Sequence, residues 1–166
     1  MSADALIAEL DQEARATRRV LERVPAEHLA WRPNPKAMRL GPLAWHVATI
    51  PGGIAGLARL DGIDAATVNF EPPMPESVER LLPAFEASLE DARAFLRGFG
   101  AEAAAAPWRL SEHGKEVFTI TRGALIRTLM LNHWYHHRGQ LVVYFRCLDV
   151  PVPAVYGRSA DEKLFG

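Results

Sequence analysis

Several features are scarce in this sequence of 166 residues, and each scarcity excludes a class of protein. There is one cysteine, Cys147, and no CxxC pair, so we expect no disulfide within the chain and no cysteine-based structural zinc site. Cys147 itself is predicted to be a small buried hydrophobic residue. The 19 lysines and arginines balance 20 acidic residues, and neither sign forms a long block. Nothing therefore favours a nucleic acid or an anionic membrane as a partner.

Long hydrophobic runs are also missing. No segment offers about 18 uninterrupted apolar residues, the length that a transmembrane helix needs. The N-terminus mixes acidic with apolar residues and has no basic flank before an apolar run, so it does not resemble a signal peptide. We expect a cytoplasmic protein with no membrane partner.

Helical periodicity dominates what is present, and the length suits a single domain over residues 1–166. Each of four long segments repeats its apolar residues at helical spacing. The predicted helices span residues 3–23, 42–60, 76–99 and 122–148. Four amphipathic helices of this length in one domain predict an all-α fold, namely a four-helix bundle.

Prolines indicate how these helices are bounded and joined. Pro51 removes a backbone donor shortly after His46, so the second helix is expected to kink or loosen there. Pro83 either lies close to the start of the third helix or kinks it. Residues 61–75 are rich in glycine, aspartate, asparagine and proline, which predicts a long crossover loop.

Two shorter elements are predicted around the last long helix. Before it, two extended pieces flank His113-Gly114, as in a short hairpin, with His113 solvated at the turn. Thr119 or Thr121 can then cap the helix. After it, Ser159-x-x-Glu162 is a capping box, which predicts a short C-terminal helix.

The stretch from Leu129 to Arg146 contains three histidines within five residues, His133, His136 and His137. On a helix, His133 and His137 lie about 40° apart at roughly 100° per residue, so both can point at one metal ion. The zinc motif HExxH uses the same spacing, but its glutamate is absent here. A single histidine on an apolar face is more often a hydrogen-bonded core residue than a ligand, and that interpretation stays open.

A third histidine far upstream strengthens the metal interpretation. His46 follows the helix start Gly41-Pro42 and shares a stripe with apolar residues, namely Leu43, Val47, Ile50, Ile54 and Leu57. One imidazole from this helix and two from the last provide three neutral nitrogen ligands. Structural zinc sites usually have four ligands, so this set indicates a site with a position open for water or substrate.

Neighbours of these histidines have two interpretations each. His136 either replaces a ligand at the i, i+3 spacing or lies at the rim of the pocket. Arg138 either forms an ion pair within the bundle or binds a substrate anion. Gly139 can allow close approach of another segment, and Gln140 can orient a ligand imidazole or a water. The aromatic residues either line a pocket or belong to the core, and they are Trp45, Trp134, Tyr135 and Tyr144.

The residues that carry this argument also resemble a known family. The segments WRPNPKAMRLGPLAWHVATIPG and HWYHHRGQLVVYFRCLDVPVPAVYGRSADE, with the signature HxxxHRGQ and an upstream LxxH, are similar to the DinB family, also called DinB/YfiT-like metalloenzymes. The resemblance covers nearly the whole chain. It implies an up-down-down-up four-helix bundle and frequent homodimers. It also implies a divalent metal ion, zinc or nickel, whose ligands match His46, His133 and His137.

The resemblance further implies a type of chemistry. Relatives with known reactions are transferases and isomerases that use mycothiol, bacillithiol or glutathione. An open three-histidine ion can lower the pKa of bound water or hold a thiol as thiolate. Glutamate and aspartate are scarce near the histidines, and no serine or cysteine has the context of a nucleophile. The expected activity is therefore a metal-dependent transfer to or from a low-molecular-weight thiol, with an unidentified small-molecule substrate.

Three alternatives stay open at this point. The first is a metal-dependent hydrolase. The second is a non-catalytic, metal-stabilised dimeric module for binding or stress response, in which chelation of the ion collapses the fold. The third is a metal-free bundle whose histidines are hydrogen-bonded in the core.

Overall fold

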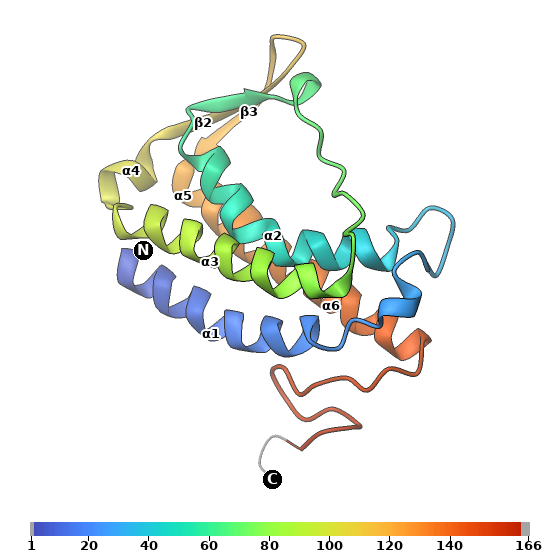
Figure 1. Ribbon diagram of the computed structural model, residues 1–166. Helices are drawn as coiled ribbons and strands as arrows, with labels where there is room; N and C mark the ends of the chain where they lie inside the picture. The colour runs from blue at the N-terminus through green and yellow to red at the C-terminus, as the bar shows by residue number, and fades with distance from the viewer. Residues whose placement is uncertain (1, 164–166) are drawn as a thin grey trace.

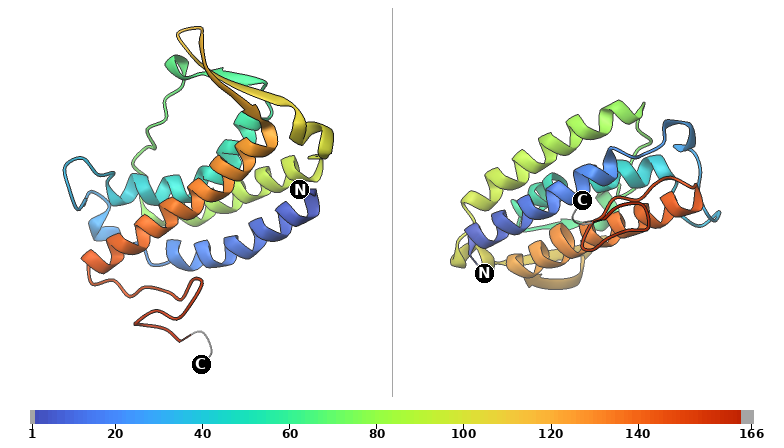
Figure 2. Two further views of the ribbon diagram at one scale, coloured as in Figure 1. Left: turned by 180° about the vertical axis from the view of Figure 1, so that it is seen from behind. Right: turned by 90° about the horizontal axis from the view of Figure 1, so that it is seen from below.

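The structure, a computed structural model, describes residues 2–163, and four long helices dominate it. Helices α1 (Ala3–Leu21) and α6 (His133–Cys147) run in one direction, whereas α2 (Leu40–Ala58) and α3 (Leu81–Arg97) run in the other (Figures 1 and 2). A long crossover joins α2 to α3, because both run the same way. The predicted up-down-down-up bundle is confirmed. None of the described helices combines the length and the apolar content that crossing a membrane requires.

Burial follows the predicted apolar stripes, as α1 illustrates. The hydroxyl of Ser2 caps this helix by accepting a hydrogen bond from the amide of Ala5 at 3.2 Å. Leu6 and Leu10 are almost fully buried, and each such side chain stabilises the fold by roughly 1.5–3 kcal/mol. They pack in one continuous core with apolar residues from the other three long helices.

A small sheet lies beyond one end of the bundle (Figure 1). Strands β2 (Pro107–Glu112) and β3 (Lys115–Thr121) form the predicted hairpin, which is thereby confirmed. A third strand, β1 (Gly62–Asp64), pairs with β2 in parallel and lies within the predicted crossover loop. The all-α prediction therefore holds for the bundle but misses this strand.

Asp64 connects β1 to the hairpin turn. Its carboxylate accepts hydrogen bonds from the amides of His113 and Gly114, at 3.0 and 2.7 Å. Both turn residues have positive φ, 51° and 76°, as a two-residue hairpin turn requires. His113 is exposed, as predicted. The hairpin turn is thus held by β1, which begins four residues after the end of α2.

Helix α3 begins later than predicted. A 3₁₀ turn, Val78–Arg80, precedes it, and the regular helix starts at Leu81. Pro83 is therefore in the first helical turn, where amide groups have no helical acceptor and a missing N–H costs nothing. The first interpretation of Pro83 is confirmed. Short helical turns also occupy three connections, at Ala26–His28, Ala65–Thr67 and Ala101–Ala105 (α4).

The last long helix contains a π-helical segment that the sequence does not predict. The sequence predicts one helix over 122–148, whereas the structure has α5 (Arg122–Leu125), a π-helical segment η4 (Ile126–Asn132) and then α6. Thr121 caps α5, because its hydroxyl accepts a hydrogen bond from the amide of Ala124 at 3.1 Å. Across the π-helical segment, buried residues lie five positions apart, as the wider π turn allows. The pairs are Leu125 with Met130 and Ile126 with Leu131.

The C-terminal tail differs from the prediction. The hydroxyl of Ser159 accepts from the amide of Glu162 at 2.9 Å, but no helix follows α6 up to residue 163. Glu162 instead forms ion pairs with Arg19 and Arg23 of α1, which hold the tail against the bundle. Cys147 is exposed, because the last turn of α6 presents it to solvent, so the predicted burial of this residue is wrong.

Candidate metal centre

Three histidine side chains from two helices converge between α2 and α6. His46 comes from α2, and His133 and His137 lie one turn apart on α6. One ring nitrogen of each lies within 4.8 Å of the others, and all three residues are partly buried. His136 is exposed and lies outside this group. The structure therefore brings together the three histidines that the sequence singles out.

Hydrogen bonds orient the imidazoles of α6. The Nδ1 atom of His137 donates to Oε1 of Gln140 at 2.7 Å, which confirms that Gln140 can orient a ring of the cluster. With its proton on Nδ1, neutral His137 presents a lone pair at Nε2. That Nε2 atom lies 2.8 Å from Nε2 of His133.

With His137 in this tautomer, neither neutral form of His133 satisfies both of its ring nitrogens. Its Nδ1 atom is buried and has no well-formed hydrogen bond among the described residues. The carbonyl of Leu129 is nearby, and its effect is to raise the pKa of His133 against the larger lowering by burial. A proton on Nε2 bonds His137 but leaves Nδ1 unsatisfied. A proton on Nδ1 sets two Nε2 lone pairs against each other. A divalent cation between the Nε2 atoms removes this conflict, so the donor set fits a metal ion.

Burial favours the neutral form of all three rings. Burial, together with the nearby His137 and His133, lowers the pKa of His46 to about 4. The pKa values of His133 and His137 are also lowered, in both cases mainly by burial. Because metal ions compete with protons for imidazole, rings that are neutral at pH 7 are ready to coordinate.

A bend in α2 shapes the site. The helix changes direction near its middle, where Pro51 lies, as the sequence predicts (Figure 1). Proline has no N–H, so the carbonyl of Val47, four residues earlier, loses its helical donor. The indole Nε1 of Trp134 donates to this carbonyl at 2.9 Å. Since Val47 follows His46 and Trp134 follows His133, the bond joins the two helices directly beside the cluster.

The backbone after Pro51 is also held from outside the helix. The amide of Gly52 donates to the hydroxyl of Ser88 on α3 at 2.8 Å. A Cβ atom at position 52 would lie 2.9 Å from the Cα of Ser88, so only glycine permits this approach. Pro51 predicts the bend, but no local pattern predicts Trp134 and Ser88 as the partners of the backbone there. The only clue in the sequence was Pro51 itself, because a proline inside a helix leaves a backbone carbonyl without its helical donor.

Another side of α6 carries a buried ion pair. Nη2 of Arg138 lies 2.6 Å from a carboxylate oxygen of Glu13, and these side chains are 2% and 8% exposed. Arg138 also donates to the hydroxyl of Thr17 at 3.0 Å and bonds that of Tyr156. The ion-pair interpretation of Arg138 is therefore confirmed. Gly139 faces open space, so the predicted close approach of another segment there is wrong.

The aromatic side chains near the cluster serve mostly the core. Trp134 is fully buried. The hydroxyl of Tyr135 donates to Glu9 at 3.0 Å, and that of Tyr144 donates to the carbonyl of Met38 at 3.1 Å. Both tyrosines also pack in or against the hydrophobic core, which favours the core interpretation.

The architecture is shared with proteins of known structure. A DinB-like protein from Bacillus cereus matches with a TM-score of 0.69 at 23% identity, covering 92% of this chain and 97% of that one. The DinB-like protein YjoA from Bacillus subtilis matches with a TM-score of 0.67 at 18% identity, covering 93% and 99%. At these identities the matches show a common fold.

Sequence comparison gives the family. The protein YrdA of Bacillus subtilis (strain 168), described as uncharacterized, is 26% identical over 157 residues, which are 90% of this chain and 85% of that protein. A model of the DinB family matches residues 1–163. The match spans the bundle, the sheet and all three histidines, and the chain therefore belongs to the DinB family.

Proposed function

We propose that the protein is a divalent-metal-dependent enzyme that uses a low-molecular-weight thiol as nucleophile, in the manner of a thiol S-transferase. The observation that carries this proposal is the convergence of three partly exposed imidazoles, two of whose Nε2 atoms are 2.8 Å apart. Zinc or nickel is the proposed ion, since both accept imidazole ligands. When bound, such an ion supplies Lewis acidity, which lowers the pKa of a coordinated thiol or water.

The chain's own residues hold and orient this group. Gln140 selects the tautomer of His137 that leaves Nε2 free. The bond from Trp134 to Val47 keeps α6 against α2. Burial keeps His46 uncharged. Because the histidines are only partly buried, a ligand can reach them.

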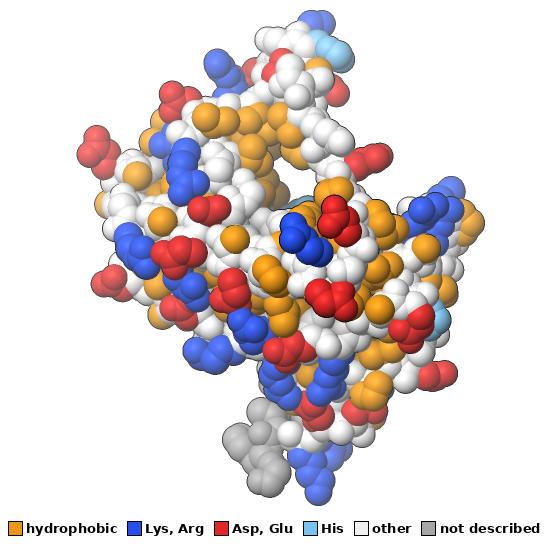
Figure 3. Space-filling model, in the orientation of Figure 1, with side chains coloured by type: hydrophobic (Ala, Val, Ile, Leu, Met, Phe, Trp, Pro, Cys, Tyr) orange, Lys and Arg blue, Asp and Glu red, His pale blue; other side chains and the backbone are white. Residues whose placement is uncertain are grey.

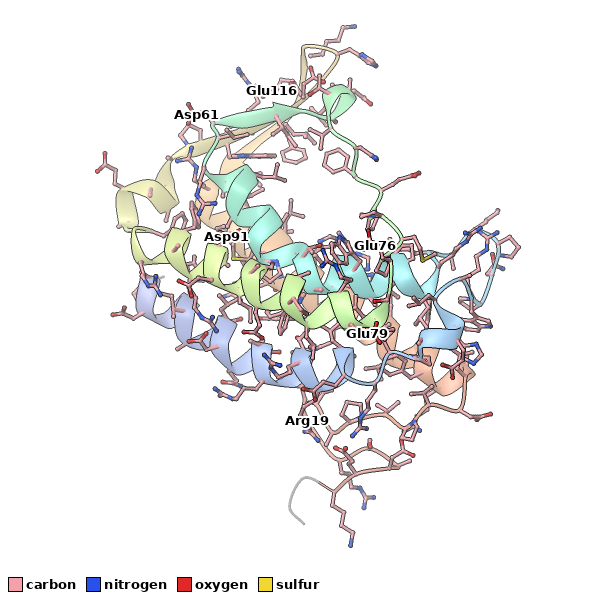
Figure 4. The ribbon with its side chains drawn as sticks, in the orientation of Figure 1. Arg19, Asp61, Glu76, Glu79, Asp91 and Glu116 are labelled. Carbon is pink, nitrogen blue, oxygen red and sulfur yellow. The ribbon has the colours of Figure 1, made fainter. Side chains whose placement is uncertain are left out.

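The composition of the cluster favours a thiol over water as nucleophile. Among the described residues, the group that can hold a metal contains histidines only. A hydrolase of the metalloprotease type needs a carboxylate as general base beside the ion. Glu76 and Glu79, labelled in Figure 4, lie exposed where the chain enters α3, and neither belongs to the cluster. A thiol that ionises on coordination needs no such base.

The metal centre is tested by elemental analysis of protein purified without a histidine tag. The comparison includes His46→Ala, the double variant His133→Ala/His137→Ala, and His136→Ala as the matched control. We expect close to one ion per chain in the parent and in His136→Ala, and loss of the ion in the other two with helical circular dichroism retained. Metal absent from the parent after incubation with zinc, nickel and manganese contradicts the proposal.

The choice of nucleophile is tested on cobalt-substituted protein. A thiol that coordinates the ion adds a thiolate-to-cobalt absorption band, whereas the matching alcohol does not. Thiols that give the band are then screened with electrophiles for S-transfer. No band with any thiol, combined with metal-dependent ester hydrolysis, would replace the transferase by a hydrolase.

A further inference from the structure

A hollow lies between the sheet and the helices. Figure 3 shows it below the sheet, with hydrophobic side chains on its walls. Residues 68–77, which we call the strap, leave the sheet region, pass beside the hollow and reach the start of α3 (Figure 1). The strap contains Pro72, Pro73 and Pro75, which limit its backbone freedom.

The sheet presents an apolar face to this hollow. The indole of Trp108 on β2 is buried and donates to the carbonyl of Leu57 at 3.1 Å, so its side of β2 faces α2. Side chains two apart on a strand share a face, and so do directly opposed cross-strand partners. Leu110 therefore faces the same way, together with its partners Ile63 on β1 and Phe118 on β3. These three side chains form one apolar row across the sheet.

Charged side chains of the sheet lie on its other side. Arg109 alternates with Trp108 and Leu110 along β2, so it faces away from α2. Arg109 lines a separate surface cleft with Asp61 and Glu116. Figure 4 shows Asp61 and Glu116 on the outer side of the sheet. The inner row is thus kept apolar.

Apolar side chains continue from the sheet to the three histidines. On α2, Ile54 and Leu57 belong to the stripe that begins at His46, and both are only partly buried. On the facing helix, Leu129 precedes His133 and is also only partly buried. These aliphatic side chains face inward but are not fully covered by other side chains of the protein, so they leave apolar surface available to a ligand.

Two aromatic rings near the hollow are too exposed to serve the core. Phe118 is 39% exposed although it lies on the inner face of the sheet, and Phe70 of the strap is 56% exposed. Exposed apolar side chains gathered around one hollow indicate a binding surface. The strap is anchored beyond this point, because Met74 and Pro75 pack against Gly41 at the start of α2.

We propose that the hollow binds the alkyl or aryl part of a small molecule whose polar end lies at the three histidines. The inference rests on the proposed function and specifies its substrate as an apolar molecule with one metal-coordinating group. A small molecule suits the site better than a protein segment, because the strap is continuous with the sheet at one end and α3 at the other. A partner chain has to pass beneath this closed loop, whereas a slender ligand enters beside it.

The proposal is tested with two series of ligands of about four to ten carbons, n-alkyl hydroxamates and n-alkanols, by calorimetric titration of the metal-loaded protein. Each methylene that enters the hollow is expected to raise affinity by about threefold to fourfold in both series. Hydroxamates are expected to bind more tightly than alkanols of equal length, and His133→Ala/His137→Ala is expected to remove that difference.

Adjacent side chains on β3 provide a matched pair of variants. Phe118→Ser is expected to weaken the longest ligands by about tenfold and to flatten the chain-length dependence. Thr119→Ala, at an exposed position that pairs with the outward-facing Arg109 on the regular part of the ladder, is expected to change affinity by less than about twofold. Both variants are expected to keep parental metal content and circular dichroism. Equal effects of the two variants overturn the proposal.

The outcomes separate this proposal from the proposed function. A flat alkanol series overturns the apolar site, however much metal the protein binds. A hydroxamate advantage that survives in His133→Ala/His137→Ala places the polar end elsewhere and also overturns the proposal. Metal absent from the parent contradicts the proposed function, whereas alkanol affinity that rises with length and falls in Phe118→Ser still supports the apolar site.

Discussion

Helix α6 carries two polar clusters that are built in opposite ways. Around Arg138 the charges are closed off: its partner Glu13 is buried with it, and Thr17 and Tyr156 complete the hydrogen bonding. Around His137 the polar atoms stay open, since three rings are partly exposed and one buried nitrogen has no partner among the described residues. His137 and Arg138 are consecutive, so one step along the helix separates a cluster suited to stability from one suited to a ligand.

The largest expected effect comes from breaking the closed cluster. Arg138→Met leaves the carboxylate of Glu13 buried without its cation, which is expected to cost about 3–5 kcal/mol of unfolding free energy. Urea unfolding measures this loss. The double variant Arg138→Met/Glu13→Leu is expected to recover most of it, because no charge then remains buried. A loss below about 1 kcal/mol in the single variant contradicts the structural role.

Breaking the open cluster is expected to affect the metal instead. Gln140→Leu removes the acceptor that orients His137 and is expected to weaken metal binding by about 10–100-fold with little change in metal-free stability. Competition with a chelator measures the affinity. Gln140→Glu keeps an acceptor and serves as the control, which is expected to retain most of the affinity. Unchanged affinity in Gln140→Leu removes Gln140 from the site.

The link between the helices gives an intermediate effect. Trp134→Phe leaves the buried carbonyl of Val47 without a donor, which is expected to cost about 1–3 kcal/mol. Pro51→Ala restores an N–H for that carbonyl, so in the Trp134→Phe background it is expected to regain stability. In the parent, where Trp134 already bonds Val47, the same change is expected to gain less. Additive effects of the two substitutions would show that they act on different groups.

The smallest expected effect is the pH dependence of the metal-free protein. The pKa of His46 is about 4 in the folded chain, below its ordinary value of 6.5, so between these values the unfolded chain binds more protons. Stability is therefore expected to fall as pH drops from 6.5 towards 4. Urea midpoints at pH 7 and 5 measure the fall, and His46→Gln is expected to reduce it. A midpoint that rises on acidification contradicts the burial of a neutral ring.

Features that depend on local periodicity were accessible from the sequence. The four helices follow from apolar stripes, and the histidine pair on α6 follows from its i, i+4 spacing. The His113-Gly114 turn has local chemistry that predicts a hairpin. Gln140 lies within a turn of His137, so its bond to that ring was also within reach.

Features that depend on distant partners were not accessible. Strand β1 has three residues and exists through parallel pairing with β2, about 45 positions later, which no local pattern reveals. Glu13 meets Arg138 from the far end of the chain. The π segment left a subtle local trace, the five-residue spacing of Leu125 and Met130, which an assumed α-helical period hides.

The bend at Pro51 also has a mechanical consequence. The part of α2 before it carries His46, whereas the part after it ends where Trp108 of the sheet bonds Leu57. At the bend, where the helical hydrogen bonding is interrupted, Trp134 and Ser88 supply hydrogen-bond partners from α6 and α3 and fix the angle between these two halves. Because Trp134 bonds the residue next to His46 and Trp108 bonds the end of α2, the angle of the bend sets the position of the sheet relative to the three histidines.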